Sequence, residues 1–315
     1  MLKYQPKPEF KERIKKLLGE EEAEKFWEIQ EKPLRNIIRC NTLKISCEEL
    51  KKRLEKKWKI LQPYKDHPGI IIIESDLGPG GLGRSIEHQL GYYYAQELSS
   101  MQSPIALQPQ PGEKILDICA ASGSKTTQIA MFMQNKGLLI ANDVSIDRIV
   151  SLDSNLERCG VTNAIVTRMN GYTLCEKFAK SGFLFDKILL DAPCTGEGTI
   201  RFDSKVLGMW NENMLRKISG LQKKLIANAI SCLKPQGILV YSTCTFAPEE
   251  DEEVIQFALD NFPVELVDFE LPLKTHQGIS EWEGKKFSNE IKKCKRVWPQ
   301  DNDSEGFFVA KLRKK

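Results

Sequence analysis

The chain has 315 residues, of which 41% are hydrophobic and 28% are charged, and its formal net charge is +3. This composition excludes a disordered or fibrous protein, and the length predicts about two domains. No apolar run approaches the ~18 residues of a membrane-spanning helix, and the charged first residues carry no signal-peptide pattern. We therefore expect a soluble, cytoplasmic protein.

The sulfur and basic residues add two constraints. Nine Cys without an export signal predict free thiols, and the absence of C-x-x-C spacing, with only three scattered His, predicts no metal site. Lys and Arg gather at residues 51–59, 292–296 and 311–315. Such runs fit solvated surfaces and phosphate contacts equally well.

The first part of the chain predicts a small mixed α/β unit. Its expected elements are, in order, an amphipathic helix, a strand, a helix capped by Ser46, a strand and a second helical stretch, at residues 10–30, 37–43, 48–57, 69–74 and 85–107. Four Gly within residues 78–83 mark a loop, and QPQPG at 108–112 marks a join. We place the domains at residues 1–108 and 109–315.

The second part alternates between strand-like and helical patterns. Strands are expected at residues 114–118, 138–143, 164–169, 186–191 and 237–242, and helices at 124–134, 145–159, 213–233 and 248–261. This alternation predicts an α/β fold with a doubly wound, Rossmann-like parallel sheet. Two late strands, at residues 264–270 and 306–312, predict one antiparallel edge pair.

Small residues follow the first strand of this sheet and precede a helix. They are Cys119, Ala120, Ala121, Ser122, Gly123 and Ser124. Ligands of doubly wound sheets lie beyond the carboxyl ends of the strands, where a helix N-terminus offers free N–H groups. The turn matches neither G-x-G-x-x-G nor the P-loop, which weakens dinucleotide and P-loop interpretations. It predicts a cofactor site, with tight packing as the alternative.

Polar residues end the next two strands. Asp143 is placed to accept hydrogen bonds from both hydroxyls of a ribose, or else to cap the following helix. Asn170 is placed to meet an adenine edge, or else to form a turn with Gly171. Together with the small-residue turn, these tips predict a site for one nucleoside-sized ligand.

Two Cys follow the last two parallel strands. Cys194 comes after Asp191 and Pro193, and Cys244 comes after Thr243. A single buried Cys is usually inert packing. Two at neighbouring strand ends, one of them close to a carboxylate, favour thiol chemistry.

The motifs DICAASGSKTTQ, AND, DAPCTGEGT and STCT, in this order, resemble the Sun (RsmB-type) family of S-adenosylmethionine-dependent RNA cytosine-5 methyltransferases. RCNTLK and GYYYAQELSSM extend the resemblance over roughly residues 33–315. Two departures stand out, because Ser122 replaces a Pro of the family's turn and Asn170 replaces its Asp. Both bear on adenosine binding.

The resemblance implies a role for each site residue. Cys244 is the nucleophile, Cys194 assists product release, and Asp191 and Lys125 act on the base or the methyl donor. S-adenosylmethionine is the implied cofactor, bound by Cys119, Ala120, Ala121, Ser122, Gly123, Ser124, Lys125, Asp143, Arg148, Asn170 and Asp191. In cytosine methyltransferases of DNA, however, the attacking Cys is the one of the Pro-Cys motif, so the two thiol roles stay open to exchange.

We therefore expect a monomeric RNA cytosine-5 methyltransferase that acts on a flipped or single-stranded cytosine of tRNA. Residues 1–108 would be the RNA-binding domain, with Arg39, Lys44 and the run 51–59 on phosphates. Ribosomal RNA is the alternative substrate. A catalytically degenerate RNA-binding protein and a dinucleotide oxidoreductase are the alternatives of other classes.

Overall fold

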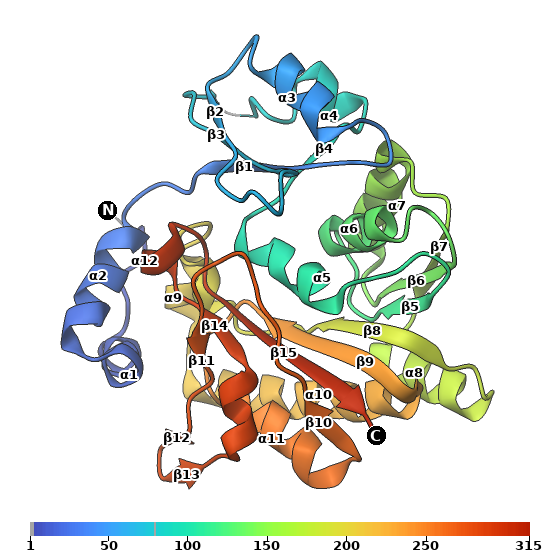
Figure 1. The fold of residues 1–315 in the computed structure, drawn as a ribbon. Coiled ribbons are helices and arrows are strands. Elements are labelled where there is room, and N and C mark those ends of the chain that lie inside the picture. Colours follow the sequence, from blue (N-terminus) through green and yellow to red (C-terminus); the bar gives the residue numbers. More distant parts are fainter. Residues whose placement is uncertain (1–2, 79) are drawn as a thin grey trace.

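A computed structural model describes residues 3–78 and 80–315. A large nine-stranded sheet lies below a smaller four-stranded sheet in the view of Figure 1. The main path of the large sheet is β11 (His276–Gln277), β14 (Lys295–Val297), β15 (Phe307–Lys314), β9 (Leu233–Thr243), β8 (Phe185–Asp191), β5 (Lys114–Asp117), β6 (Leu138–Asp143) and β7 (Ala164–Arg168). The ninth strand, β10 (Val264–Leu266), lies off this path and pairs with β15.

Strands β9, β8, β5, β6 and β7 are parallel to one another. The chain runs from β5 to β6 and β7 on one side and then returns to β8 and β9 on the other. The carboxyl ends of β5 and β8 therefore lie where the strand order reverses, which is the usual ligand site of such sheets. The predicted doubly wound sheet is confirmed.

The predicted antiparallel edge pair is only partly right. Strand β10 does pair with β15 in the antiparallel sense, but β15 lies between β9 and β14 rather than at the edge. Residues 271–305, expected to be a connection, contribute β11 and β14. These strands are two and three residues long and Val297 is their one apolar residue, so no apolar alternation marks them.

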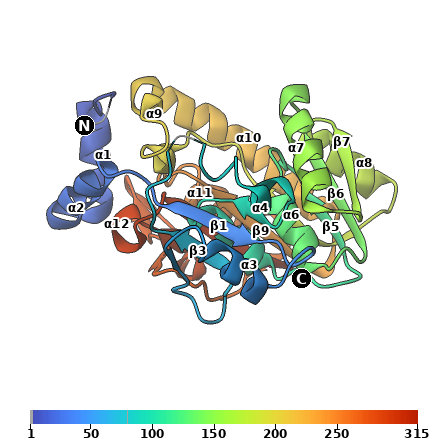
Figure 2. The same cartoon turned by 90° about the horizontal axis from the view of Figure 1, so that it is seen from above.

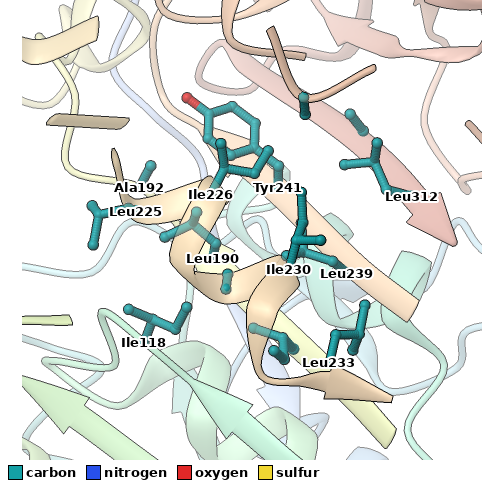
Figure 3. Close-up of a cluster of buried hydrophobic side chains, with 14 of the residues drawn as sticks. Ile118, Leu190, Ala192, Leu225, Ile226, Ile230, Leu233, Leu239, Tyr241 and Leu312 are labelled. Carbon is teal, nitrogen blue, oxygen red and sulfur yellow. The ribbon is translucent and has the colours of Figure 1, made fainter. Parts of the chain in front are cut away.

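Helices cover both faces of the parallel strands. α8 (Gly171–Lys180), α10 (Glu212–Ser231) and α11 (Glu252–Asn261) pack on one face, where Leu190, Ile226, Ile230, Leu239 and Tyr241 belong to one buried cluster (Figure 3). α5 (Gln102–Leu107), α6 (Ser124–Phe132) and α7 (Ile146–Cys159) cover the other face. Burial on both faces explains why the strands are continuous apolar runs.

The smaller sheet has the order β2 (Ile60–Leu61), β3 (Ile70–Ile73), β1 (Asn36–Cys40) and β4 (Tyr93–Ala95), and all its pairs are antiparallel. α3 (Cys47–Leu54) packs on it through Leu50 and Leu54. The predicted cap is confirmed, because the Ser46 hydroxyl accepts a hydrogen bond from the Glu49 N–H at 3.1 Å.

Two of the expected helices are divided. The helix expected over residues 10–30 is split into α1 (Pro8–Leu18) and α2 (Glu20–Gln30), because Gly19 has a φ of +80°. Figure 2 shows both helices at one end of the molecule, where they pack against Trp210, Phe246 and Trp298 rather than on the small sheet.

The helical stretch expected over residues 85–107 is also interrupted. It contains α4 (Ile86–Gln89), then β4, then a 3-10 turn, η1 (Ser99–Met101), before α5. Tyr94 pairs with Arg39 of β1, so strand pairing overrides the helical spacing of the apolar residues.

Arg39 connects strand β1 of the small sheet to helix α6 of the large-sheet part, and its side chain does not face solvent. Its side chain is buried, and it donates to the Ser124 carbonyl at 2.8 Å, to Thr127 Oγ1 at 2.8 Å and to the side chains of Gln96 and Gln128. Burial lowers its pKa to about 10. The expectation that Arg39 holds RNA phosphates is therefore wrong, because its donors are used inside the protein.

Other basic residues are engaged in the same way. Lys44 donates to the carbonyls of Leu90 and Arg158, and Arg296 is buried against Glu252. Lys314 donates to the carbonyls of Ile230 and Leu233. The runs at 292–296 and 311–315 therefore serve mainly the fold, whereas Lys51, Lys52 and Lys56 of the run 51–59 are exposed.

The described residues were searched for membrane-spanning helices, metal-binding groups and disulfides. No helix among residues 3–78 and 80–315 has both the length and the apolarity to cross a membrane. No group of three or more His, Cys, Asp or Glu in that part of the chain is placed to hold a metal ion. All nine Cys are free.

We predict that Arg39→Met destabilises the protein by about 2–4 kcal/mol, because buried acceptors on Gln96, Thr127 and Gln128 lose a charged donor. Urea-induced unfolding measures this change. Arg53→Met is the control, since the Arg53 side chain is 41% exposed, lies 3.5 Å from Glu49 and stacks over the Tyr92 ring, and its loss should cost less than about 1 kcal/mol. Equal effects of the two substitutions would contradict the prediction.

Candidate active site

Neighbouring parallel strands end around one cavity of about 300 Å³. It lies at the reversal of strand order and is bounded by β5, β6, β8 and β9 and by the start of α8. Its lining consists of Ile118, Cys119, Asn142, Asp143, Val144, Arg148, Asn170, Gly171, Asp191, Ala192, Pro193, Cys194, Leu221, Leu225 and Cys244. Most residues predicted from the strand ends are therefore brought together, but Ala120, Ala121, Ser122, Gly123, Ser124 and Lys125 are not among the lining.

The two thiols meet in this cavity. In the parallel pair β8 and β9, Asp191 lies beside Ser242, so the residues that follow emerge side by side. The Sγ atoms of Cys194 and Cys244 are 3.2 Å apart, within hydrogen-bond distance for sulfur. The hydrogen bond with Cys244 and burial raise the pKa of the Cys194 thiol. One cysteine can therefore keep its proton as a thiol and donate a hydrogen bond to the other cysteine, which would be the thiolate.

Lys125 and Asp191 form a partly buried ion pair beside the thiols. Lys125 Nζ lies 2.8 Å from Asp191 Oδ2 and 3.0 Å from Ser100 Oγ, and Ser242 Oγ donates to Asp191 Oδ1 at 2.7 Å. Burial acts to lower the pKa of Lys125, but the Asp191 carboxylate outweighs burial and the pKa is raised. Lys125 therefore stays positively charged next to the cavity. It reaches this place because it is the second residue of α6.

Asp143 lies at the tip of β6 with its side chain buried. Its Oδ1 accepts from the Ser145 N–H at 3.0 Å, and its Oδ2 lies 3.3 Å from the Ala121 N–H and 3.2 Å from Arg148 Nη1. Arg148 also donates to the Ala121 carbonyl, and its side chain is 55% exposed. The carboxylate thus holds the turn after β5 and the start of α7 while facing the cavity.

The turn after β5 is fixed by short contacts. Ala120 N–H donates to the Asn142 carbonyl and Gly123 N–H to the Ala120 carbonyl, both at 2.8 Å. Gly123 has a φ of +100°, and a Cβ there would lie 3.1 Å from Leu152 Cδ1, so this position requires glycine. Ser122 is exposed, and its carbonyl accepts a hydrogen bond from the Asn155 side chain at 2.9 Å. At the start of the turn, burial raises the pKa of the Cys119 thiol.

Asn170 caps a helix, a role that differs from both the adenine contact and the turn with Gly171 that the sequence offered. Its Oδ1 accepts from the Tyr172 N–H at 3.2 Å at the start of α8, a helix that the sequence pattern missed. Asn170 also lines the cavity, so capping and ligand contact are compatible.

Three residues that support the site were not predicted from the sequence. Buried Asn142 ties three strand tips together, because its amide donates to the carbonyls of Ile118 and Met169 at 3.0 Å each. Ser100 and Ser242 hold the two ends of the Lys125–Asp191 pair. Only Asn142 carried a signal, as the residue preceding the acidic strand tip.

Two family models match the chain. The one described as 16S rRNA methyltransferase RsmB/F covers residues 104–313, and the one described as N-terminal domain of 16S rRNA methyltransferase RsmF covers residues 7–98. A tRNA (cytosine(49)-C(5))-methyltransferase from Pyrococcus abyssi is 45% identical over 98% of both chains. A ribosomal RNA small subunit methyltransferase F from Vibrio parahaemolyticus is 40% identical over 92% of this chain but only 59% of its own length.

Solved structures agree in fold. A methyltransferase homolog protein from Pyrococcus horikoshii has a TM-score of 0.84 at 38% identity, covering 96% of this chain and 94% of its own. NSun6 from the same organism, solved with SFG, has a TM-score of 0.82 at 27% identity, covering 98% of each chain. The resemblance of the motifs is confirmed, and the chain belongs to the RsmB/F (Sun) family of RNA cytosine-C5 methyltransferases.

Proposed function

We propose that this enzyme methylates carbon 5 of a cytosine in tRNA, with S-adenosylmethionine as the methyl donor and a covalent cysteine adduct as the intermediate. The observation that carries the proposal is the pair of thiols 3.2 Å apart beside the Lys125–Asp191 ion pair. The tRNA substrate is supported by a relative of that activity that matches along nearly its whole length, whereas the rRNA relative is much longer than this chain.

The residues around the cavity fit the adenosine part of the donor. Asp143 would accept from the ribose hydroxyls and Asn170 would lie at the adenine edge, and both line the cavity. The turn from Cys119 to Ser124 reaches the lining through Cys119, and its other small side chains would leave room beside the cavity. The fit rests on the buried carboxylate of Asp143, which faces the cavity and has one charged partner, the largely exposed Arg148. Bound S-adenosylmethionine supplies an electrophilic methyl group on its sulfonium.

The thiols and the ion pair would activate the base. Carbon 5 of cytosine is a poor nucleophile, and addition of the Cys244 thiolate to carbon 6 moves an electron pair to carbon 5. Asp191 would accept a hydrogen bond from the amino group, or from ring nitrogen 3 once addition has led to its protonation, and Lys125 would stabilise the thiolate and orient Asp191. After methyl transfer a general base removes the proton from carbon 5, the C6–S bond breaks, and its electrons return to the Cys244 sulfur.

The cytosine must be flipped or single-stranded, because stacking covers the ring face from which carbon 6 is attacked. The exposed lysines of α3 and the residues after it would hold RNA phosphates at the small sheet, since Arg39 and Lys44 are engaged elsewhere. Contacts of this kind weaken as salt rises.

The proposal is tested by bisulfite sequencing of unmodified tRNA and 16S rRNA incubated with the enzyme and S-adenosylmethionine. A protected cytosine in tRNA alone is the expected result. Protection in rRNA alone would move the substrate to ribosomal RNA, and protection in neither would favour a catalytically degenerate RNA-binding protein.

We predict that Cys244→Ala abolishes methylation and forms no adduct, because it removes the proposed nucleophile. Cys194→Ala should instead accumulate a covalent protein–RNA adduct, since release of the product is impaired. Denaturing gel electrophoresis with labelled tRNA detects the adduct. Adduct formation by Cys244→Ala, with none by Cys194→Ala, would exchange the two roles.

We predict that Lys125→Met lowers the single-turnover rate of methylation by about 100-fold or more, because Asp191 loses its cation and the Cys244 sulfur loses a positive charge that interacts with it. Lys180→Met is the control, since Lys180 is exposed on α8 and pairs only with Glu176 at 2.6 Å. A Lys125→Met enzyme as fast as this control would contradict the role of the ion pair.

A further inference from the structure

A buried carboxylate lies directly behind the two thiols. Glu250 is fully buried and accepts hydrogen bonds from the Thr195 N–H at 3.0 Å, from the Thr195 hydroxyl and from Gln222 Nε2 at 2.9 Å. The same amide of Gln222 donates to the Pro193 carbonyl at 2.9 Å. Glu250 therefore fixes the backbone on both sides of Cys194.

The second thiol loop is tied to the same carboxylate. The hydroxyls of Thr195 and Thr245 are 2.9 Å apart, and Thr245 Oγ1 accepts from the Ala247 N–H at 3.3 Å. Because the Thr195 proton goes to Glu250, the Thr245 hydroxyl donates to Thr195. Each of these threonines directly follows one of the cysteines, so one buried cluster sets the distance between the two sulfur atoms.

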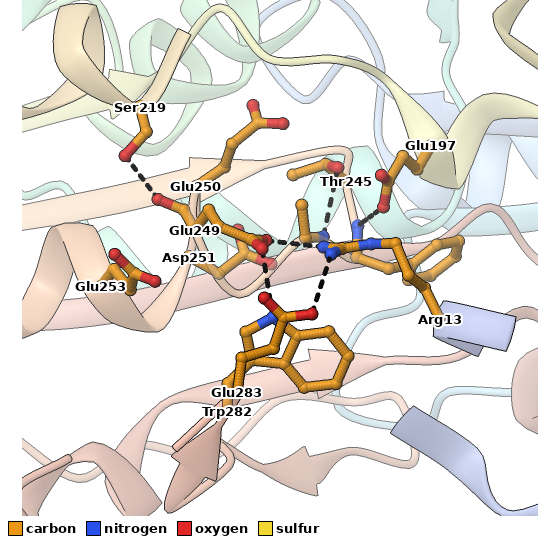
Figure 4. Close-up of polar contacts among 12 residues, drawn as sticks. Arg13, Glu197, Ser219, Thr245, Glu249, Glu250, Asp251, Glu253, Trp282 and Glu283 are labelled. Atoms are coloured by element: carbon orange, nitrogen blue, oxygen red, sulfur yellow. Dashed lines mark hydrogen bonds and ion pairs between the residues drawn. The ribbon is translucent and has the colours of Figure 1, made fainter. Parts of the chain in front are cut away.

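The hydrogen-bond partners of Glu250 are all neutral, and its charged neighbours are paired with other groups. Among the described residues, Glu197 of the turn η2 (Glu197–Thr199) accepts from Trp210, Asp251 before α11 lies 3.4 Å from Arg296, and Glu249 pairs with Arg13. Figure 4 shows the Glu250 carboxylate pointing to the opposite side from Glu249 and Arg13. The Tyr241 hydroxyl of β9 donates only to the Glu250 main-chain carbonyl.

The charges on the two sides of the thiol pair are opposite. Burial acts to lower the pKa of Lys125, but the negative charges of Asp191 and then of the Cys244 sulfur outweigh burial and raise it. On the other side, the hydrogen bond with Cys244, burial and then the negative charges of Cys244 and Glu250 raise the pKa of Cys194. A proton shared between the sulfurs is therefore drawn to Cys194 and away from Cys244.

We propose that Glu250 is a positioning residue that sets the spacing of the two thiols and, through its negative charge beside Cys194, keeps the proton on Cys194 and the thiolate on Cys244. This inference rests on the proposed function. In this arrangement the Cys194 S–H would donate to the Cys244 sulfur, 3.2 Å away. When the C6–S bond breaks and its electrons return to Cys244, the same S–H stabilises the departing sulfur, so Cys194 assists release while remaining a thiol.

The test measures thiol reactivity without RNA or cofactor. The full chain is partially alkylated with iodoacetamide between pH 6 and 9, and mass spectrometry gives the initial ratio of modification at Cys244 to that at Cys194. Burial raises the pKa of Glu250 to about 7, so in the wild type the ratio should favour Cys244 and rise as the pH rises through this value. Glu250→Gln preserves the shape and should give a lower ratio that no longer depends on this ionisation.

Glu249→Gln is the matched control, because Glu249 is the preceding residue but pairs with Arg13 on the other side. It should leave the ratio and its pH dependence unchanged. Thermal unfolding checks the fold: Glu250→Gln should raise the Tm above that of the wild type at pH 8 but not at pH 4, because the folded state resists ionising Glu250 only above its unfolded pKa.

Specific outcomes overturn the proposal. They are an equal ratio in Glu250→Gln and wild type at pH 8, the same fall in Glu249→Gln, or faster alkylation of Cys194 than of Cys244 in the wild type. Single-turnover methylation is measured in parallel, and Glu250→Gln should slow it and flatten its pH profile near 7. A wild-type enzyme that methylates no RNA yet shows the expected alkylation ratios would contradict the proposed function and not the role of Glu250.

Discussion

The parallel pairing of β8 with β9 is the constraint on which the site depends. Its register places Asp191 beside Ser242, and each cysteine follows closely, Cys194 as the third residue after β8 and Cys244 as the first residue after β9. A shift of the register by one residue would turn the side chains of one strand to the other face of the sheet. The hydrophobic cluster under α10 resists such a shift, because alternate residues of both strands are buried in it.

Around this pair the protein separates two kinds of electrostatic neighbour. A cation comes from the first turn of α6, and an anion comes from the segment before α11. Each is held by residues from distant parts of the chain, Ser100 for Lys125 and Gln222 for Glu250. Two chemically identical side chains therefore occupy different surroundings, which is what distinct roles for them require.

The sequence predicts the strand tips well and their supporting contacts poorly. Asp143, Asp191, Cys194 and Cys244 follow apolar runs, and such runs mark buried parallel strands irrespective of the rest of the fold. Glu250 lies within an acidic run that reads as a solvated surface, and its burial arises from packing under β9 and α10. Arg39 was misassigned for the converse reason, because one charge in a short strand gives no sign of which domain covers it.

The packing of α1 and α2 has a consequence for how the molecule unfolds. Phe10 and Phe26 of these helices share a cluster with Trp210, Phe246 and Trp298, which lie about 180 to 290 residues further along the sequence. Arg201, whose side chain is fully buried, donates to the carbonyls of Lys32, Pro33 and Ser304. Helices α1 and α2 therefore share their core with the carboxyl-terminal part of the chain, whereas the small sheet and α3 have a buried cluster of their own and are tied to α6 through Arg39. Loss of the large sheet's structure should therefore expose the apolar faces of α1 and α2 at the same time, although these helices lie at the opposite end of the sequence from Trp298.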